Sequence, residues 1–241
     1  FVGQGVIGGA PDGTTATLGR EGSDYSAAVA ANILGAESMS IWKDVDGVMN
    51  ADPKAFPDAV QIPELNYLDA IELAYSGAQI IHPMTVKPLQ NRNIPLYVRP
   101  FGDKRKPGTV IRGMSAPVEV PILILKKDQV LLTIRSRDLS FVLEEKFGTI
   151  FSLLERYRIK ANLIHNSAVN LSLCVDNTWH IDDAVSALRD AGFDVLKAAD
   201  MELLTIRGYD EAIYMRYAQI GPKVFIRQTT QSTVRLVRKR E

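Results

Sequence analysis

The sequence predicts an α/β protein with a mainly parallel sheet and flanking helices, followed by two smaller units of strands and helices. Up to residue 112, short apolar strands alternate with helical segments, which favours a parallel sheet. From residue 129 onward, the spacing of apolar residues follows the order strand, helix, strand, strand, helix, strand. The length of 241 residues leaves room for about two domains of ordinary size.

Composition argues against several classes of protein. The 28 Lys and Arg residues balance 28 Asp and Glu residues, so no general attraction to nucleic acid or membranes is expected. Cys174 is the single cysteine, which leaves no internal disulfide and no cysteine-rich metal site. No stretch approaches the ~20 apolar residues of a membrane span, and no signal peptide is recognisable, so a cytoplasmic location is expected.

The stretch from Thr14 to Tyr25 predicts an anion-binding loop. Glycines at positions 19 and 22 bracket Arg20, and Ser23 and Asp24 open an alanine-rich run that predicts a helix. We expect Ser23 to cap this helix and Asp24 to lie in its first turn. A helix N-terminus offers free N–H donors, and the guanidinium of Arg20 matches a carboxylate bidentately. Each residue alone fits an ordinary capped turn, but their combination favours a carboxylate or phosphate site.

Turn and capping signals place the other elements of the first part. The run from Pro11 to Gly13 predicts a turn between two strands, and Gly35 ends the first helix. Asn66 predicts the N-cap of a second helix, and His82, beside Pro83, is interpreted as a structural residue before a third. The other expected strands cover residues 38–42, 79–83, 94–99 and 108–111, and the expected apolar side of the second helix consists of Leu68, Ile71 and Tyr75.

The pattern changes at residues 112–117, which predict a domain boundary. Val130–Ile134 is interpreted as an apolar strand, and residues 169–175 alternate apolar and polar side chains, as in a strand with one buried face. A helix with Leu143, Phe147, Ile150, Phe151 and Leu154 at helical spacing and a second around residues 181–188 complete a ferredoxin-like unit. Residues 201–238 predict a second, shorter copy, with a helix around residues 211–217 and strands at 223–228 and 233–238.

Three motifs resemble those of the aspartokinases. Leu18–Tyr25 is similar to the family's L-G-R-G-G-S-D-Y signature, and Gly3–Gly8 is similar to its T-Q-G-F-I-G. Trp42–Lys54 resembles W-T-D-V-D-G-V-x-T-A-D-P-R, the segment that holds the nucleotide in the family. The resemblance extends through nearly the whole chain. It implies a partial amino acid kinase fold followed by two ferredoxin-like ACT domains, the amino-acid-sensing modules of this family.

The resemblance also implies a division of the chain. Residues 1–112 correspond to the C-terminal, nucleotide-binding half of the amino acid kinase domain, and residues 113–128 to a linker. Residues 129–200 correspond to the first ACT domain and residues 201–241 to part of the second. Because the family inserts the first ACT domain into the second, Pro121–Leu125 belong either to the linker or to the second domain. Nothing matches the lysine- and glycine-rich phosphate-binding segment of the family, so a fragment without activity of its own is expected.

Aspartokinases transfer a phosphoryl group from MgATP to the side-chain carboxylate of L-aspartate, giving 4-phospho-L-aspartate on the way to lysine, threonine and methionine. By resemblance, Arg20 binds the α-carboxylate of aspartate, with Glu21, Gly22 and Ser23 beside it, and Asp24 orients a catalytic lysine that this chain lacks. Nucleotide contacts are implied at Lys43, Asp44, Met49, Lys54, Gln79 and Ile80. The implied cofactors are ATP and Mg²⁺, and no cluster of protein metal ligands is expected.

Four positions depart from the family pattern. Glu21 replaces a glycine beside the carboxylate site, and Gln79 stands where the family often has lysine. Lys43 replaces the usual threonine, and Lys54 replaces the usual arginine. Relative to the family pattern, this chain lacks a positive charge at Gln79 and has an additional one at Lys43. We therefore expect Lys43 to contact nucleotide phosphate in place of the missing lysine.

Feedback control through the ACT domains is a further implication of the resemblance. The family's effector site uses the loop before the first ACT helix and the start of the next strand, residues 140–147 and 160–168 here. The effector residues implied are Ser140, Leu143, Phe147, Asn162 and Ser167. Lysine is the first expectation for the effector and threonine the second, and pairing of edge strands predicts a homodimer or higher oligomer. The alternative is an ACT pair that only dimerises, with Asn162 and Ser167 as ordinary strand-end residues.

Two other functions compete with this one. Another enzyme of the amino acid kinase fold, acting on glutamate or acetylglutamate, is disfavoured by the motif at residues 19–25 and by the ACT pair. A non-catalytic sensor or dimerising module is compatible with the departures at Lys43, Lys54 and Gln79. Bifunctional relatives carry a homoserine dehydrogenase part, but this chain stops just after the second ACT-like unit, so the monofunctional form is expected.

Overall fold

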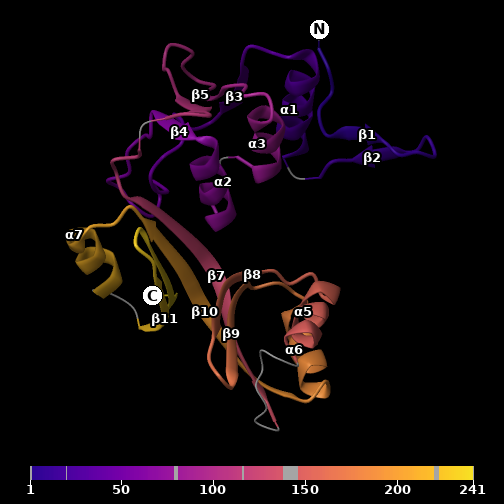
Figure 1. Cartoon of the computed structure of the whole chain (residues 1–241), viewed down its shortest axis with the longest axis vertical. Helices are drawn as coiled ribbons and strands as arrows, with labels where there is room; N and C mark the ends of the chain where they lie inside the picture. Colours follow the sequence, from indigo (N-terminus) through magenta and orange to yellow (C-terminus); the bar gives the residue numbers. More distant parts are fainter. Residues whose placement is uncertain are drawn as a thin grey trace. The chain divides into compact units, whose positions relative to one another are not determined.

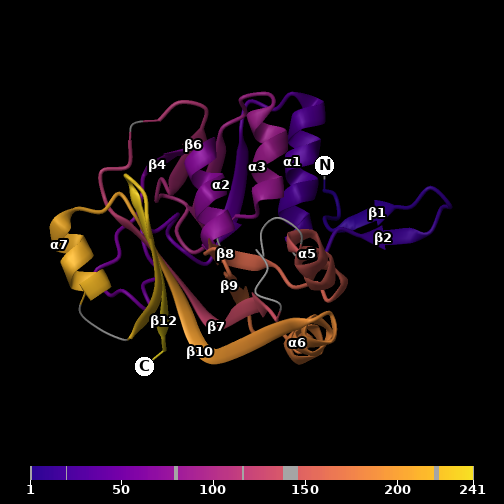
Figure 2. The same ribbon diagram turned by 60° about the horizontal axis from the view of Figure 1, so that its bottom comes forward.

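The computed structural model describes residues 2–19, 21–78, 81–115, 117–137, 146–219 and 223–240. The chain folds into two compact units, Phe1–Ile124 and Leu125–Glu241, shown in Figures 1 and 2 in colours that follow the sequence. The predicted linker, residues 113–128, contains the boundary between them. Each unit has its own sheets and its own hydrophobic core.

The first unit begins with a short antiparallel hairpin of β1 (Ile7–Gly9) and β2 (Thr15–Thr17). Asp12 shapes the turn because its carboxylate accepts hydrogen bonds from the backbone N–H and the hydroxyl of Thr14, at 3.0 and 2.7 Å. Gly13 follows with a φ of 83°, a left-handed conformation that glycine adopts without strain. The predicted strand, turn and strand are confirmed.

A four-stranded mixed sheet forms the centre of the first unit, in the order β3-β5-β6-β4. The strands are β3 (Met39–Lys43), β4 (Glu64–Asn66), β5 (Leu96–Pro100) and β6 (Thr109–Arg112). β3 is parallel to β5 and β4 is parallel to β6, whereas β5 and β6 are antiparallel. The sheet is therefore mainly parallel, as predicted, but the sequence pattern does not predict β4.

Three helices pack against one face of this sheet: α1 (Gly22–Leu34), α2 (Tyr67–Ser76) and α3 (Pro83–Gln90). Figure 2 shows α3 lying between α1 and α2. The strands alternate between this buried face and a more exposed one, where the guanidinium of Arg99 lies 4.8 Å from the ring of Tyr97 and 5.9 Å from that of Trp42. Among the described residues, the helices of this unit thus cover one face of the sheet.

Capping residues set the ends of these helices. Asn66 accepts a hydrogen bond from the backbone N–H of Asp69 at 2.7 Å, as predicted for the start of α2. Nδ1 of His82 accepts from the backbone N–H of Met84 at 3.2 Å, which confirms its structural role before α3. Gly35 ends α1 with a φ of 61°.

The buried side of α2 differs from the prediction. Leu68 and Tyr75 are 62% and 57% exposed, whereas Tyr67 and Leu73 are buried. Tyr67 explains the difference, because its hydroxyl donates a hydrogen bond to the backbone oxygen of Ile94 at 2.7 Å. A tyrosine whose hydroxyl has a hydrogen-bond partner can be buried in the core. Tyr67 therefore lies on the buried side of α2.

The second unit contains a six-stranded sheet in the order β11-β12-β10-β7-β9-β8. Its first elements are β7 (Ile122–Ser136), α5 (Phe147–Arg156), β8 (Ala161–Asn166), β9 (Asn170–Asp176), α6 (Ile181–Asp190) and β10 (Phe193–Arg207). β9 is antiparallel to both β7 and β8. The last strand of this succession lies beside the first, which confirms the element order of a ferredoxin-like unit.

Helices α5 and α6 lie side by side and pack on the apolar side chains of one face of this part of the sheet (Figure 1). On β9 the other face is also buried at Cys174, which packs with Leu131, Leu163 and Met201. The prediction of a single buried face is therefore wrong at this position. Burial raises the pKa of the Cys174 thiol to about 12, so Cys174 acts as a small apolar residue.

The shorter copy continues the same sheet. α7 (Glu211–Tyr214) passes into a π-helix (Met215–Gln219), and β11 (Val224–Thr229) and β12 (Thr233–Lys239) follow as predicted. β12 is antiparallel to both β10 and β11. β7 and β10 are each 15 residues long. Of Pro121–Leu125, all residues but Pro121 lie within β7, and residues 129–200 and 201–241 share one sheet.

Two buried threonines in the first unit differ in their hydrogen bonding. Both Thr109 and Thr85 are 0% exposed. The Thr109 hydroxyl accepts a hydrogen bond from the backbone N–H of Val48 at 2.8 Å and donates to the carbonyl of Ile62 at 2.5 Å. The Thr85 hydroxyl has no partner within the part of the chain that the structure describes.

The substitution Thr109→Val should lower the free energy of unfolding by roughly 1–3 kcal/mol, because it leaves a buried N–H and a buried C=O unpaired. Thr85→Val is the matched control and should leave the free energy unchanged or raise it. Denaturant unfolding of both variants measures the difference. Equal effects would contradict the structural role of Thr109.

Candidate functional site

The start of α1 differs from the prediction in its capping residue. α1 begins at Gly22, and Glu21 before it has a φ of 59° and a ψ of 19°, a left-handed conformation. Ser23 therefore lies within the first turn and is exposed, so the prediction that it is the N-cap is wrong. Asp24 lies in the first turn, as predicted. Arg20, the predicted carboxylate ligand, lies outside the described residues.

The backbone conformation of Glu21 and the burial of its side chain are both energetically unfavourable. Its left-handed conformation is unfavourable for glutamate and easy for the glycine that the family resemblance gives at this position. Its Oε2 atom is buried and has no hydrogen-bond partner among the described residues. A buried carboxylate oxygen is costly unless a donor or a cation reaches it. Glu21 thus gives this loop a left-handed backbone and a buried carboxylate oxygen at the same residue.

Two glycines let the chain approach the start of α1 closely. A Cβ atom on Gly5 would lie 2.7 Å from Cα of Ser23, and one on Gly22 would lie 2.8 Å from Cβ of Leu18. The backbone N–H of Leu18 donates to the carbonyl of Val6 at 2.7 Å and holds the two segments together. A larger residue at either glycine would displace this backbone, so these two positions fix the shape of the loop.

An ion pair joins α1 to the end of β3. Nζ of Lys43 lies 2.9 Å from Oδ2 of Asp24, and the two side chains are only 26% and 15% exposed. Lys43 is the last residue of β3, and the parallel strand β5 ends beside it. In α/β proteins, ligands bind at such carboxyl ends of parallel strands. The structure thus brings together two of the predicted site residues.

The loop after β3 carries most of the other predicted nucleotide contacts. Asp44 and Lys54 are exposed, and Met49 is partly buried in a β-bridge with Gln61. The backbone N–H of Lys54 donates to Oδ1 of Asp52 at 2.9 Å. Gln79 and Ile80, the last two predicted contacts, lie outside the described residues.

Asn50 anchors this loop to the core of the first unit. Its side chain donates a hydrogen bond to the carbonyl of Pro121 at 2.8 Å and accepts one from the backbone N–H of Val60 at 2.7 Å. Gly47 has a φ of 154°, and a Cβ atom there would lie 2.6 Å from Oγ1 of Thr109. The loop therefore leaves β3 and returns to the core on a fixed path.

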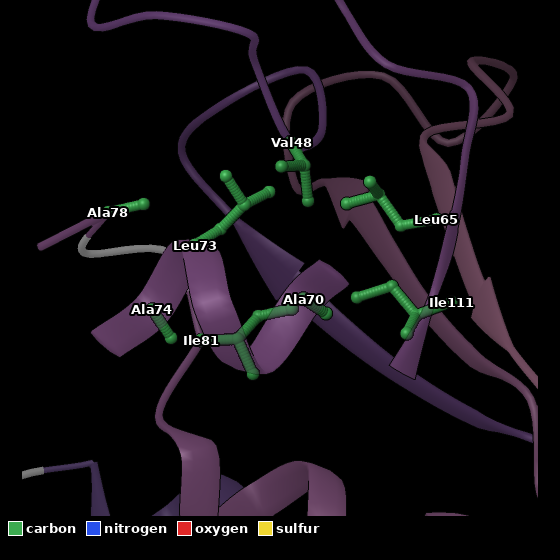
Figure 3. A pocket seen from close by; sticks show the side chains of 8 residues that line it. All are labelled: Val48, Leu65, Ala70, Leu73, Ala74, Ala78, Ile81 and Ile111. Atoms are coloured by element: carbon green, nitrogen blue, oxygen red, sulfur yellow. The ribbon is translucent and has the colours of Figure 1, made fainter. Parts of the chain in front are cut away.

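An apolar cavity lies between α2 and the sheet of the first unit, and Figure 3 shows side chains of Leu73, Ile81 and Ile111 around it. Its volume is about 10 Å³. A single water molecule needs about that much space and several polar partners, which this lining does not offer. The cavity is therefore a packing void and not a ligand site.

In the second unit, the structure describes three of the five predicted effector residues. Phe147 opens α5 and stacks with Phe151, with 4.5 Å between ring centroids. Ser167 is exposed in the turn between β8 and β9, where its hydroxyl accepts from the backbone N–H of Asn170 at 3.2 Å. Asn162 lies on β8, and its side chain makes several hydrogen bonds. Ser140 and Leu143 lie outside the described residues.

Asn162 belongs to a polar network on the sheet of the second unit. Its Oδ1 accepts from Nζ of Lys126 at 2.8 Å, and its Nδ2 donates to Oε1 of Gln129 and to Oδ1 of Asp176 at 2.8 and 2.9 Å. Nζ of Lys126 also pairs with Oδ1 of Asp176 at 2.9 Å. Partial burial alone would raise the pKa of Asp176, but hydrogen bonds from Gln129, Lys126 and Asn162 outweigh it and hold this pKa below its usual value.

Sequence reasoning missed three members of this network: Lys126, Gln129 and Asp176. One signal was present, because Gln129 directly precedes the apolar run Val130–Ile134. A polar side chain at the edge of a buried strand needs partners, and Gln129 is in fact 1% exposed. The identity of those partners depended on strand pairing, which the sequence does not specify.

Two features are absent from the part of the chain that the structure describes. No group of three or more His, Cys, Asp or Glu side chains there is arranged to hold a metal ion. No helix there has both the length and the apolar character that crossing a membrane requires.

Comparison with known proteins points to one group of enzymes. Residues 1–100 match the Amino acid kinase family. Lysine-sensitive aspartokinase 3 of Escherichia coli (strain K12) is 37% identical over 177 residues, which cover 73% of this chain and 39% of that protein. The chain therefore spans about two fifths of the length of this relative.

Solved structures agree with the sequence relatives. The crystal structure of E. coli aspartokinase III in complex with aspartate and ADP (R-state) matches with a TM-score of 0.81 and 28% identity, over 98% of this chain and 56% of that one. The structure of the same enzyme in complex with lysine and aspartate (T-state) matches with a TM-score of 0.76 and 27% identity, over 97% and 55%. The similarity thus includes both units.

Proposed function

Because the chain belongs to the aspartokinase family, we propose that it forms part of the active site of an aspartate kinase. The reaction is phosphoryl transfer from MgATP to the side-chain carboxylate of L-aspartate. The observation that carries the proposal is the ion pair between Asp24 and Lys43, which joins the start of α1 to the end of β3. The E. coli enzyme matched by the fold was solved with aspartate and ADP.

Substrate binding is proposed at the start of α1. The first turn of α1 presents backbone N–H groups and the positive end of the helix dipole, which suit a carboxylate. We assign the α-carboxylate of aspartate to Arg20, with Gly22 and Ser23 beside it. Glu21 adds a negative charge at this place, which suits the ammonium group of aspartate better than either of its carboxylates.

Nucleotide binding is proposed along the loop after β3, at Lys43, Asp44, Met49 and Lys54, with Gln79 and Ile80 nearby in the family pattern. The charged residues of this loop fit ATP with its Mg²⁺, because ammonium groups neutralise phosphate oxygens and carboxylates are ligands that Mg²⁺ accepts. Asp24 holds the ammonium group of Lys43 in place through the 2.9 Å contact. Phosphoryl transfer depends on such positioned positive charge more than on covalent chemistry.

Regulation is proposed for the second unit. Its ferredoxin-like topology is that of an ACT domain, and we propose that it binds an amino acid effector and pairs with a second copy of the chain. Lysine is the first choice, because a matched structure of E. coli aspartokinase III contains lysine. Threonine is the second. We also propose a location in the cytoplasm, together with a role in amino acid biosynthesis.

The full-length protein should form 4-phospho-L-aspartate from aspartate and MgATP, and Arg20→Ala should raise the KM for aspartate by about tenfold to a hundredfold. The reason is the loss of a charge-assisted contact of about 1.5–3 kcal/mol to the substrate carboxylate. Trapping the acyl phosphate with hydroxylamine measures the reaction, with glutamate and acetylglutamate as competing substrates. Arg105→Ala, in an exposed loop, is the control. Turnover of glutamate but not aspartate, or an unchanged KM, would refute the assignment.

Lys43→Ala should raise the KM for ATP by about tenfold or more, because it removes a cation from the phosphate site. Lys87→Ala, an exposed lysine on α3, is the matched control and should leave both KM values unchanged. A purely structural role of Lys43 predicts a loss of stability with equal changes for both substrates. An intact KM for ATP would show that Lys43 does not replace the missing lysine.

Calorimetric titration of the protein with lysine should give saturable binding, and Asn162→Ala should weaken it. Gln231→Ala, which alters an exposed amide side chain between β11 and β12, is the control and should bind as the wild type does. Asn162 also holds Lys126 and Asp176, so a thermal unfolding scan of each variant separates lost binding from lost stability. If neither lysine nor threonine binds, the sensor role fails and the dimerising role remains.

A further inference from the structure

A polar pocket lies in the second unit, and its lining includes none of the residues assigned to the effector. Its volume is about 310 Å³. It is lined by Arg135 on β7, Arg137 directly after β7, Asn170 on β9 and Asp194 on β10, together with Thr133, Arg189, Val195 and Leu196. This volume is at the lower end of the range of small-molecule sites.

Strand pairing explains why these side chains meet. Arg135 is directly opposite Asn170 in the antiparallel pair of β7 and β9. Successive side chains of a strand point to opposite faces, so Arg135 lies on the face away from Ile134, which packs in the core under α5 and α6. Arg137 follows the last residue of β7 and contacts the same carboxylate as Arg135, that of Asp194. β10 is the neighbour of β7 on its other side and brings Asp194.

The pocket carries a surplus of positive charge. Nη2 of Arg135 and Nε of Arg137 both contact the carboxylate of Asp194, at 3.4 and 3.2 Å. Nη2 of Arg189 donates to the backbone oxygen of Val195 at 2.9 Å. Three guanidinium groups and one carboxylate leave a formal surplus of two charges.

Among the described residues, Arg135 and Arg137 keep hydrogen-bond donors that their contacts to Asp194 do not use. Each guanidinium has five N–H donors, and the contacts of Arg135 and Arg137 to Asp194 are long and involve one nitrogen each. The two side chains are 52% and 57% exposed, so their remaining donors are accessible. Leu196, 74% exposed, adds an apolar wall to the pocket.

We propose that this pocket binds a small dianion between Arg135 and Arg137. The ligand class is a short dicarboxylate or a phosphate group, because either one presents paired oxygens to a guanidinium fork and neutralises two charges. The pocket shares no lining residue with the proposed kinase site or with the residues assigned to the lysine effector. The simplest competing explanation is a set of ordinary surface ion pairs, which bind nothing and contribute little to stability.

The test is calorimetric titration of the protein with succinate and, separately, inorganic phosphate at low ionic strength. Saturable binding of one anion per chain is expected, and the anion that binds more tightly identifies the ligand class. The double variant Arg135→Gln, Arg137→Gln should weaken binding at least about tenfold, because it removes charge-assisted hydrogen bonds. Arg156→Gln, an exposed arginine on α5, is the control and should leave binding unchanged.

Asp194→Asn gives the opposite prediction. It removes the carboxylate that competes for both guanidinium groups, so it should strengthen anion binding. This variant keeps the proposal testable if the double variant fails to fold, which far-ultraviolet circular dichroism would show. Absence of saturable binding by both anions to the wild type would overturn the proposal. So would weaker binding by Asp194→Asn, or unchanged binding by a folded double variant.

Discussion

The ion pair between Lys43 and Asp24 is the interaction on which the proposed kinase site depends. It joins the first turn of α1 to the last residue of β3, and both side chains are largely shielded from water. Removing one partner of a shielded pair leaves an uncompensated charge, so each residue constrains the other. Lys43, which we propose replaces the lysine that the family often has at the position of Gln79, thereby holds its positive charge at a fixed place, beside the helix start proposed to bind the substrate carboxylate.

Local signals in the sequence predicted most of the fold. Asn66 and His82 cap helices because their side chains accept from nearby backbone N–H groups, and Asp12 and Gly13 form a turn for equally local reasons. The order of strands and helices in the second unit also followed from spacing alone. The strand β4 was missed because Leu65 is the only apolar residue among its three, so no apolar run marks it.

The candidate site was predictable in its residues but not in its contacts. Nothing local indicates that Lys43 reaches Asp24, 19 positions earlier, because that contact depends on how α1 packs beside β3. Ser23 has the chemistry of an N-cap, yet the helix begins one residue earlier because Glu21 adopts the left-handed conformation. Asn162 has the chemistry of a ligand-binding residue, yet strand pairing surrounds it with partners of its own.

The long strand β7 carries residues of two hydrophobic cores, of the polar network and of the proposed anion pocket. Ile122 and Ile124 at its start belong to the core of the first unit, and Leu132 and Ile134 belong to the core under α5 and α6. β7 also carries Gln129, a member of the polar network, and Arg135, one of the arginines of the proposed anion pocket. A strand packed on both sides resists bending, so a ligand that changes the position of β7 at one of these places must change it along the strand. Binding at the arginine pocket and at Asn162 should therefore be coupled energetically, in either direction. Measuring lysine affinity with and without saturating succinate would reveal that coupling as a shift in the dissociation constant, and an unchanged constant would show that the two places act independently.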